Sequence, residues 1–255
     1  MQTLPTSLYS AQQARDIDRI AQESLSITGF ELMTKAASVG FKAIQEHYPA
    51  ANRLAFFCGA GNNAGDGYLI AAMAIAAGYR VQLVSLVATQ KIQGDSALAK
   101  QVLLDAGGII LQDLETLDNA TDLVVDALLG TGLDRNVSGK FAEAISYINT
   151  MVAPVLAIDI PSGLNADTGN IMGCAVVADF TISFIVLKKG LFTGLAADYC
   201  GTVIFSDLEV PDTIIQVFQS HESILTPASL TRRKACSHKG NYGHVLVLAG
   251  SSGKE

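Results

Sequence analysis

Short apolar runs alternate with amphipathic stretches along most of the chain. The apolar runs lack the polar alternation of a half-exposed strand, so they predict strands that helices cover on both faces. These runs lie at residues 53–58, 81–87, 108–111, 122–128, 155–160, 179–185 and 202–205. Helices are predicted at residues 10–25, 28–48, 68–77, 95–106 and 138–149. The order predicts an α/β fold: a doubly wound, mainly parallel, Rossmann-like sheet with helices on both faces and two N-terminal helices.

N-cap signals in the sequence predict where three of these helices begin. Ser10 with Gln13 forms a candidate capping box for the first helix, and Thr28 opens the second with a glutamate three residues on. Asp95 is the expected N-cap of the fourth helix. The two helices before the first strand are an N-terminal extension that could cover a sheet edge or a ligand, and a covered edge would favour a homodimer.

A glycine-rich segment follows the first strand. Residues 59–67 contain four glycines and are predicted as a tight loop before a helix that begins at Tyr68. Such a loop can aim backbone N–H groups and a helix N-terminus at an anionic ligand. It also carries Asn62, Asn63 and Asp66, more side-chain oxygen than a phosphate cradle needs. Asp66 has a plainer alternative, as the N-cap of the helix from Tyr68.

Three predicted strands end in polar loops that contain glycine. These loops are residues 59–67, 126–136 and 159–164. In doubly wound sheets, ligands bind beyond the carboxyl ends of the strands. If the three strands are neighbours, the three loops converge on one site.

Composition and charge restrict the classes of ligand and partner that the chain can bind. Hydrophobic residues make up 49% and charged residues 16% of the 255 residues, and the net charge is −7. Binding to nucleic acid needs clustered basic residues, so a nucleic-acid partner is not expected. The four cysteines form no C-x-x-C pair and indicate reduced thiols. No signal peptide or membrane span is predicted, so we expect a cytoplasmic protein without a membrane partner.

Two common enzyme classes fit the loops poorly. A dehydrogenase fingerprint would need closer glycine spacing than Gly61 to Gly65, and an acid after the second strand, where residues 88–90 are Ala-Thr-Gln. A serine hydrolase would need a glycine two residues before the nucleophile, but Ile160 stands there relative to Ser162.

A cation site fits the loops better. The three loops carry six side chains that offer amide, carboxylate or hydroxyl oxygens, with no histidine among them: Asn62, Asn63, Asp66, Asp126, Asp159 and Ser162. Such a set suits a weakly charged monovalent ion better than a divalent one. Asn63, Asp126 and Ser162 could instead bond only to loop backbone, and spacing alone leaves both interpretations open.

Four motifs, in order, resemble the NAD(P)H-hydrate epimerase family (YjeF N-terminal domain). They are Gly-Asn-Asn-Ala-Gly-Asp-Gly at 61–67, Val-Asp-Ala-Leu-Leu-Gly-Thr-Gly-Leu at 125–133, Ala-Ile-Asp-Ile-Pro-Ser-Gly-Leu at 157–164, and Thr-Ile-Ser-Phe with Leu-Lys-Lys-Gly at 181–190. Ala64 stands where glycine is more usual, and Lys189 where proline is common. The resemblance covers roughly residues 8–210.

The resemblance implies an isomerase that repairs damaged cofactors. Members interconvert the R and S forms of NADHX and NADPHX, in which the reduced nicotinamide is hydrated at C6, and they bind one potassium ion. Carried over by motif, Asn63, Asp126 and Ser162 are the expected potassium ligands. The expected substrate-binding residues are Asn62, Asn63, Ala64, Gly65, Asp66, Gly130, Thr131, Gly132, Leu133, Asp134, Arg135, Asn136 and Asp159.

The chemistry needs a proton donor and acceptor near C6. Asp159, at a strand end, is the expected acid/base, and Lys188 is the second candidate, as a donor or as the partner that sets the charge of the aspartate. A solvent-exposed surface lysine is the alternative for Lys188. A non-catalytic nucleotide-binding or regulatory module on the same fold is the alternative function.

The C-terminal segment predicts the start of a second domain. Residues 1–220 form the expected epimerase domain. Residues 221–255 are predicted to form a linker followed by a strand and glycine loop at 237–251. This motif resembles the opening of the ADP/ATP-dependent NAD(P)H-hydrate dehydratase family, which has a ribokinase-like fold. Bifunctional members carry that lyase covalently linked after the epimerase. We expect this chain to epimerise but not to dehydrate, because the rest of the second domain is absent from it.

Overall fold

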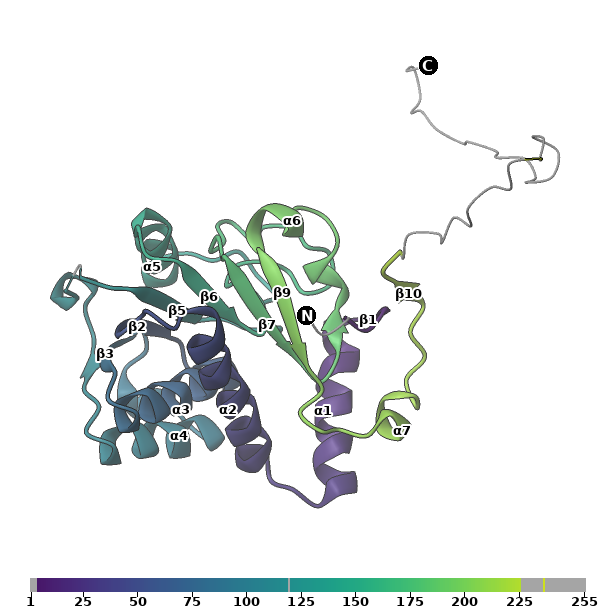
Figure 1. Cartoon of the computed structure of the whole chain (residues 1–255), viewed down its shortest axis with the longest axis horizontal. Helices are drawn as coiled ribbons and strands as arrows, with labels where there is room; N and C mark the ends of the chain where they lie inside the picture. The colour runs from purple at the N-terminus through teal and green to yellow at the C-terminus, as the bar shows by residue number, and fades with distance from the viewer. Residues whose placement is uncertain (1–3, 119, 226–235, 237–255) are drawn as a thin grey trace. The chain divides into compact units, whose positions relative to one another are not determined.

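The computed structural model describes residues 4–118, 120–225 and 236. The chain divides into two compact units, Met1–Ile224 and Leu225–Glu255. The strand and glycine loop expected at 237–251 lie outside the described residues. The first unit carries the sheet and its helices (Figure 1). None of the helices in the described residues has the length and hydropathy needed to cross a membrane.

A seven-stranded sheet forms the centre of the first unit. All neighbouring strands in it run parallel, in the order β4-β3-β2-β5-β6-β7-β9. The strands are β2 (Arg53–Cys58), β3 (Arg80–Ser85), β4 (Ile110–Leu111), β5 (Leu123–Ala127), β6 (Val155–Ile158), β7 (Phe180–Phe184) and β9 (Thr202–Ser206). The chain builds outward from β2 to β4 and then resumes on the other side of β2 with β5. The predicted doubly wound fold is confirmed, and its direction reverses between β2 and β5.

Helices cover both faces of this sheet. Figure 1 shows α2, α3 and α4 gathered on one side and α5 on the other. The alternation along β2 matches this arrangement, because Phe56 packs in the core on the α2 and α3 side and Phe57 packs against α5. The helices are α1 (Ala11–Leu25), α2 (Gly29–His47), α3 (Asn62–Ala76), α4 (Asp95–Asp105), α5 (Lys140–Thr150), α6 (Ala196–Tyr199) and α7 (Asp212–Ile215), with 3-10 turns η1 (Thr89–Lys91), η2 (Leu114–Thr116) and η3 (Lys189–Leu191).

Two helix starts follow the sequence and two do not. Both predicted capping boxes are formed, at Ser10 and at Thr28. The N-cap of α4 is Gly94 rather than Asp95, which lies one residue inside the helix. The predicted loop over residues 59–67 is also wrong in part, because α3 already begins at Asn62 with Gly61 as its N-cap.

The glycines of α3 have a packing role instead of a loop role. A Cβ on Gly65 would lie 2.5 Å from the sulfur of Met33 on α2, and one on Gly67 would lie 2.6 Å from Cβ of Ala127 on β5. Both distances are shorter than a non-bonded contact allows. Glycine at these positions therefore lets α3 lie close to the sheet and to α2, with its N-terminus at the ends of the central strands.

A second, small sheet was not predicted. It has the order β10-β1-β8 and consists of β1 (Ser7–Tyr9), β8 (Leu187–Lys188) and β10 (Glu222–Ser223). In its register Tyr9 lies opposite Lys188. The segment expected as a linker from residue 221 thus begins with a strand that pairs with β1. This sheet joins the N-terminus to the segment that carries Lys188.

Candidate active site

A pocket of about 660 Å³ opens at the carboxyl ends of β2, β5 and β6. These strands are direct neighbours, so the predicted convergence of the three loops is confirmed. Residues of the α1 and α2 helices close the pocket from the other side. Its position at the reversal of strand order is the one expected for ligand sites in doubly wound sheets.

Asp159 and Lys188 form an ion pair in this pocket. Nζ of Lys188 lies 2.5 Å from Oδ1 of Asp159, and the other carboxylate oxygen accepts a hydrogen bond from the backbone N–H of Thr131 at 3.3 Å. Asp159 directly follows β6 and has φ 69°, in the left-handed region that non-glycine residues seldom adopt. Such strain is typical of functional residues held by their surroundings. Here it turns the carboxylate toward Lys188.

Lys188 is not a surface lysine, so that alternative is wrong. The residue is only 4% exposed, and Nζ also donates hydrogen bonds to Oγ of Ser183 and to the backbone oxygen of Phe184. Three acceptors satisfy the ammonium donors. The small sheet positions Lys188 at the pocket, because β8 pairs with β1 at this residue.

Asp126 and Ser162 form a second pair beneath the pocket. Both are fully buried. Oγ of Ser162 donates to Oδ1 of Asp126 at 2.6 Å, and the backbone N–H of Ser162 donates to Oδ2 at 2.8 Å. Burial raises the pKa of Asp126 to about 6, against the hydrogen bonds from Ser162, which lower it. With Ser162 engaged by an aspartate rather than a histidine, the serine hydrolase interpretation finds no support in this geometry.

Asn63 has unmet hydrogen-bonding capacity at the edge of the pocket. It is 8% exposed, and neither Oδ1 nor Nδ2 of its side chain has a hydrogen-bond partner in the described residues. Leaving both atoms unpaired costs about 1–3 kcal/mol each unless a ligand meets them. A Cβ on Gly130 would lie 3.3 Å from both Asn63 and Oδ2 of Asp159, so the amide lies next to the loop that bonds Asp159. The unpaired oxygen of Asn63 thus indicates a ligand at this point.

Asp66 and Asp18 are among the other carboxylates that line the pocket. Asp66 lies inside α3 and is not its N-cap, so the capping alternative is wrong. Burial raises the pKa of Asp66 well above its usual value, and the charges of Asp159 and Asp18 raise it further. Asp18, on α1, was not predicted. Asp18 lies on a helix that contains none of the four motifs. The only sequence signal for its position is that it follows Ile17, an apolar residue that is buried in the core.

The predicted substrate-binding residues divide into two groups. The following predicted residues line the pocket: Asn62, Asn63, Asp66, Gly130, Thr131, Gly132, Leu133, Asp134, Arg135, Asn136 and Asp159. Ala64 and Gly65 do not line it, since Ala64 is fully buried in the core and Gly65 faces α2. Arg15 on α1 donates to the backbone oxygen of Thr131 at 3.3 Å and so ties α1 to the loop after β5.

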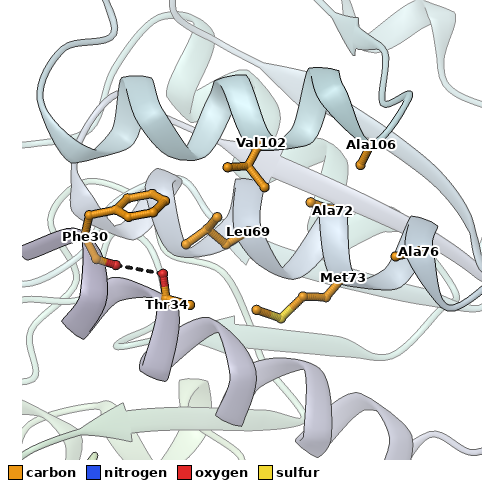
Figure 2. A pocket seen from close by; sticks show the side chains of 8 residues that line it. All are labelled: Phe30, Thr34, Leu69, Ala72, Met73, Ala76, Val102 and Ala106. Carbon is orange, nitrogen blue, oxygen red and sulfur yellow. Dashed lines mark hydrogen bonds between the residues drawn. The ribbon is translucent and has the colours of Figure 1, made fainter.

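A second, smaller hollow of about 350 Å³ lies between α2, α3 and α4. Figure 2 shows its side chains, which are apolar apart from Thr34, whose hydroxyl donates to the backbone oxygen of Phe30. It offers no titratable group, so the chemistry belongs to the larger pocket. Nor do the described residues contain a cluster of three or more His, Cys, Asp or Glu suited to a metal ion.

Comparison with known sequences assigns the chain to a family. The model of the family described as YjeF-related protein N-terminus matches residues 29–190. The chain belongs to this family. The match includes all four motifs at 61–67, 125–133, 157–164 and 181–190, so the resemblance seen in the sequence is confirmed.

Two relatives indicate what members of the YjeF N-terminal family do. The NAD(P)H-hydrate epimerase of Limosilactobacillus fermentum is 38% identical over 204 residues, which cover 78% of this chain and 95% of that protein. The bifunctional NAD(P)H-hydrate repair enzyme Nnr of Escherichia coli K12 is 37% identical over 257 residues, 98% of this chain and 49% of that protein. The chain spans about half the length of this and the similar bifunctional relatives.

A solved structure supports the fold. The yeast protein ynu0 (YNL200c) superposes with a TM-score of 0.72 over 86% of this chain and 99% of its own, at 19% sequence identity. At this identity the likeness concerns the fold alone. It shows that a similar fold has been observed in a crystal structure.

Proposed function

We propose that this chain is an NAD(P)H-hydrate epimerase that interconverts the R and S forms of NADHX and NADPHX, a metabolite-repair isomerase. The observation that carries the proposal is the Asp159–Lys188 pair, held in a pocket at the reversal of strand order. The family match and the epimerase relative, which the chain covers almost completely, support the same activity.

In the proposed mechanism, Asp159 exchanges a proton with the hydroxyl group at C6. Its carboxylate is fixed by two donors, Lys188 and the N–H of Thr131, so its position does not depend on the substrate. Preorganised donors and acceptors of this kind avoid reorganisation during the reaction. Lys188 balances the charge of the aspartate, and the loop at 130–136 with the start of α3 provides backbone N–H groups for the dinucleotide phosphates.

Incubation with a single epimer tests this function. Purified protein given only (R)-NADHX should bring it to the R/S equilibrium mixture, followed by chromatography. The alternative function, a regulatory or nucleotide-binding module, predicts binding of the same compound without any rise in the other epimer above a protein-free sample. That second result would refute the epimerase.

A potassium ion fits the residues around Asn63. Its unpaired amide oxygen, the carboxylate of Asp126 and the hydroxyl of Ser162 would hold the ion. All three are oxygen ligands of the kind that hard cations prefer. When bound, the ion would supply positive charge beside the substrate anion. The unmet hydrogen-bonding capacity of Asn63 is the observation that supports this site.

Potassium should stabilise the wild-type protein but not the Asn63→Leu variant. In potassium chloride the melting temperature of the wild type should rise above its value in tetramethylammonium chloride at equal concentration, because a ligand of the folded state stabilises it. Asn63→Leu removes two unpaired polar atoms and should lose this response, with substrate affinity weakened about tenfold. An equal potassium response in both proteins, measured by scanning calorimetry, would show that these loops are only structural.

The remaining expectations concern the protein beyond this domain. We propose that residues 221–255 lead into a covalently linked dehydratase domain, a lyase, in the full-length protein. The support is the 237–251 motif and the bifunctional relatives, of which this chain spans about half. A cytoplasmic location and a homodimer stay predictions, and sedimentation of the purified protein tests the second.

A further inference from the structure

Asp18 presents a carboxylate to the pocket from a rigid helix. α1 begins with a complete capping box at Ser10. Ile17 and Ala21 beside Asp18 are fully buried in the core, which fixes the rotation of the helix. Asp18 is partly exposed, and it lines the same pocket as Asp159 and Lys188. Its position is therefore set by the fold, without help from a loop.

The Asp18 carboxylate is unpaired in the part of the chain that the structure describes. Among the described residues, it makes no hydrogen bond and no ion pair. Its own helix offers only Arg15 nearby, and that guanidinium donates to the backbone oxygen of Thr131 and to Gln12. The charged groups that face it come from other elements: Asp66 on α3, Asp159 after β6 and Lys188 on β8. A carboxyl group that is partly buried without a hydrogen-bond partner costs stability, so a structural role does not explain its position.

These surroundings favour the neutral acid. Burial raises the pKa of Asp18 to about 7, the negative charge of Asp159 raises it further, and the positive charge of Lys188 lowers it. A carboxylic acid that holds its proton near neutral pH is suited to general-acid catalysis. Asp159 differs in its environment, because its two oxygens accept bonds from Lys188 and Thr131. Two carboxyl groups in unlike environments can hold opposite roles.

We propose that Asp18 is the second acid–base group of the site, the proton donor to the C6 hydroxyl for which Asp159 is the matching acceptor. This inference rests on the proposed epimerase function. Inversion at a carbon that carries a hydroxyl requires one group to help the oxygen leave and another to help it return on the other face. Asp18 and Asp159 reach the pocket from different walls, the first from α1 and the second from the sheet edge.

The proposed step balances without any further reagent. Asp18 gives its proton to the C6 hydroxyl, the C6–O bond breaks with its electron pair leaving in water, and the lone pair of the ring nitrogen forms the N1=C6 iminium bond. Water then adds to the opposite face of C6, the π electrons return to N1, and the Asp159 carboxylate takes the proton of the added water. One proton has moved from Asp18 to Asp159, and proton exchange of both carboxyl groups with water returns them to their starting states before the next turnover.

Asp18→Asn should lower kcat for single-epimer conversion by about 100-fold, with KM changed less than threefold. Asn keeps the size of the side chain and cannot give up a proton. Asp16→Asn is the matched control, since Asp16 lies on the same helix, outside the pocket lining, and bonds only Gln12; its rate should equal that of the wild type. If the wild type and control also fail to interconvert the epimers, the epimerase function is refuted together with this role. A wild-type rate in Asp18→Asn overturns the role of Asp18 alone.

The pH dependence gives a second readout. The wild-type rate should fall as the pH rises above about 7, where Asp18 loses its proton, and the Asp18→Asn variant should lack this fall.

The stability of the folded protein should depend on the protonation of the same carboxyl group. Because the pKa is raised in the folded state, the wild type loses stability as the pH rises from about 4 to about 7. At pH 8 Asp18→Asn should therefore melt at a higher temperature than the wild type, with no such gain at pH 4. A lower melting temperature for the variant at pH 8, or an unchanged pH–rate profile, would overturn the proposal.

Discussion

Asp159→Asn should reduce the rate of R/S interconversion by about 10³- to 10⁴-fold while the protein still unfolds cooperatively. Loss of a general acid–base group typically costs 10²- to 10⁴-fold. The upper part of this range is expected because the substitution removes both the proton acceptor and the partner of Lys188. The rate is measured by chromatography after incubation with one epimer.

The substitution is suited to this test because it preserves the local backbone. Asp159 has φ 69°, and asparagine tolerates the left-handed region better than other residues of similar size. The remaining amide oxygen can still accept the bond from the N–H of Thr131. Lys188 keeps its bonds to Ser183 and Phe184, so its ammonium retains acceptors.

Asp95→Asn provides the matched control for Asp159→Asn. Asp95 also contributes a carboxylate to the pocket lining, but it has no contact with Lys188. Its replacement should change the rate less than threefold. Equal losses in both variants would mean that general charge in the pocket, rather than Asp159 itself, supports the reaction. Wild-type activity in Asp159→Asn would remove it from the mechanism.

The sequence predicted the sheet and the convergence of three loops for a physical reason. Strands buried on both faces must be continuously apolar, so their positions are visible without knowledge of tertiary contacts. Once β2, β5 and β6 are neighbours, the loops that follow them must meet. The segments that hold Asn63, Asp126 and Asp159 could therefore be predicted from the sequence alone to lie close together.

The burial of Lys188 could not be predicted in this way. Its strand β8 has two residues, and the partner β1 has three. Elements so short have no periodicity, and their pairing joins the two ends of the domain. Asp18 was missed for a related reason. It belongs to the polar side of an amphipathic helix, where aspartates usually face solvent, and only the docking of α1 turns it toward the pocket.

The start of α3 shows how local and tertiary signals can conflict. Glycine and asparagine disfavour helix interiors, so residues 62–67 were predicted as a loop. The close contacts of Gly65 with Met33 and of Gly67 with Ala127 outweigh that cost, because any larger residue would push α3 away from the sheet. As a consequence, Asn63 and Asp66 project from a helix, and their positions are more rigid than a loop would allow.

Gly163→Ala should destabilise the fold by about 4 kcal/mol or more, one of the largest effects of any single substitution. Gly163 has φ +95°, and a Cβ there would lie 1.9 Å from the backbone oxygen of Cys174. That oxygen belongs to a segment held against the same turn, since the N–H of Val176 donates to the backbone oxygen of Ser162 at 2.9 Å. Neither side can move without breaking these bonds. Urea denaturation measures the loss.

Gly107→Ala separates the two causes of this effect. Gly107 also has a positive φ of +86°, but nothing lies within 4 Å of the position of its Cβ. Its replacement should cost only the left-handed strain, about 1–2 kcal/mol. The difference between the two variants then measures the backbone contact at Gly163. Because Ser162, which directly precedes Gly163, makes both hydrogen bonds to Asp126, a Gly163→Ala protein that remains in solution should also lose the potassium response of the wild type. Equal destabilisation of the two variants would show that the turn after β6 can shift, and the Ser162–Asp126 pair would then owe its geometry to its own hydrogen bonds rather than to this glycine.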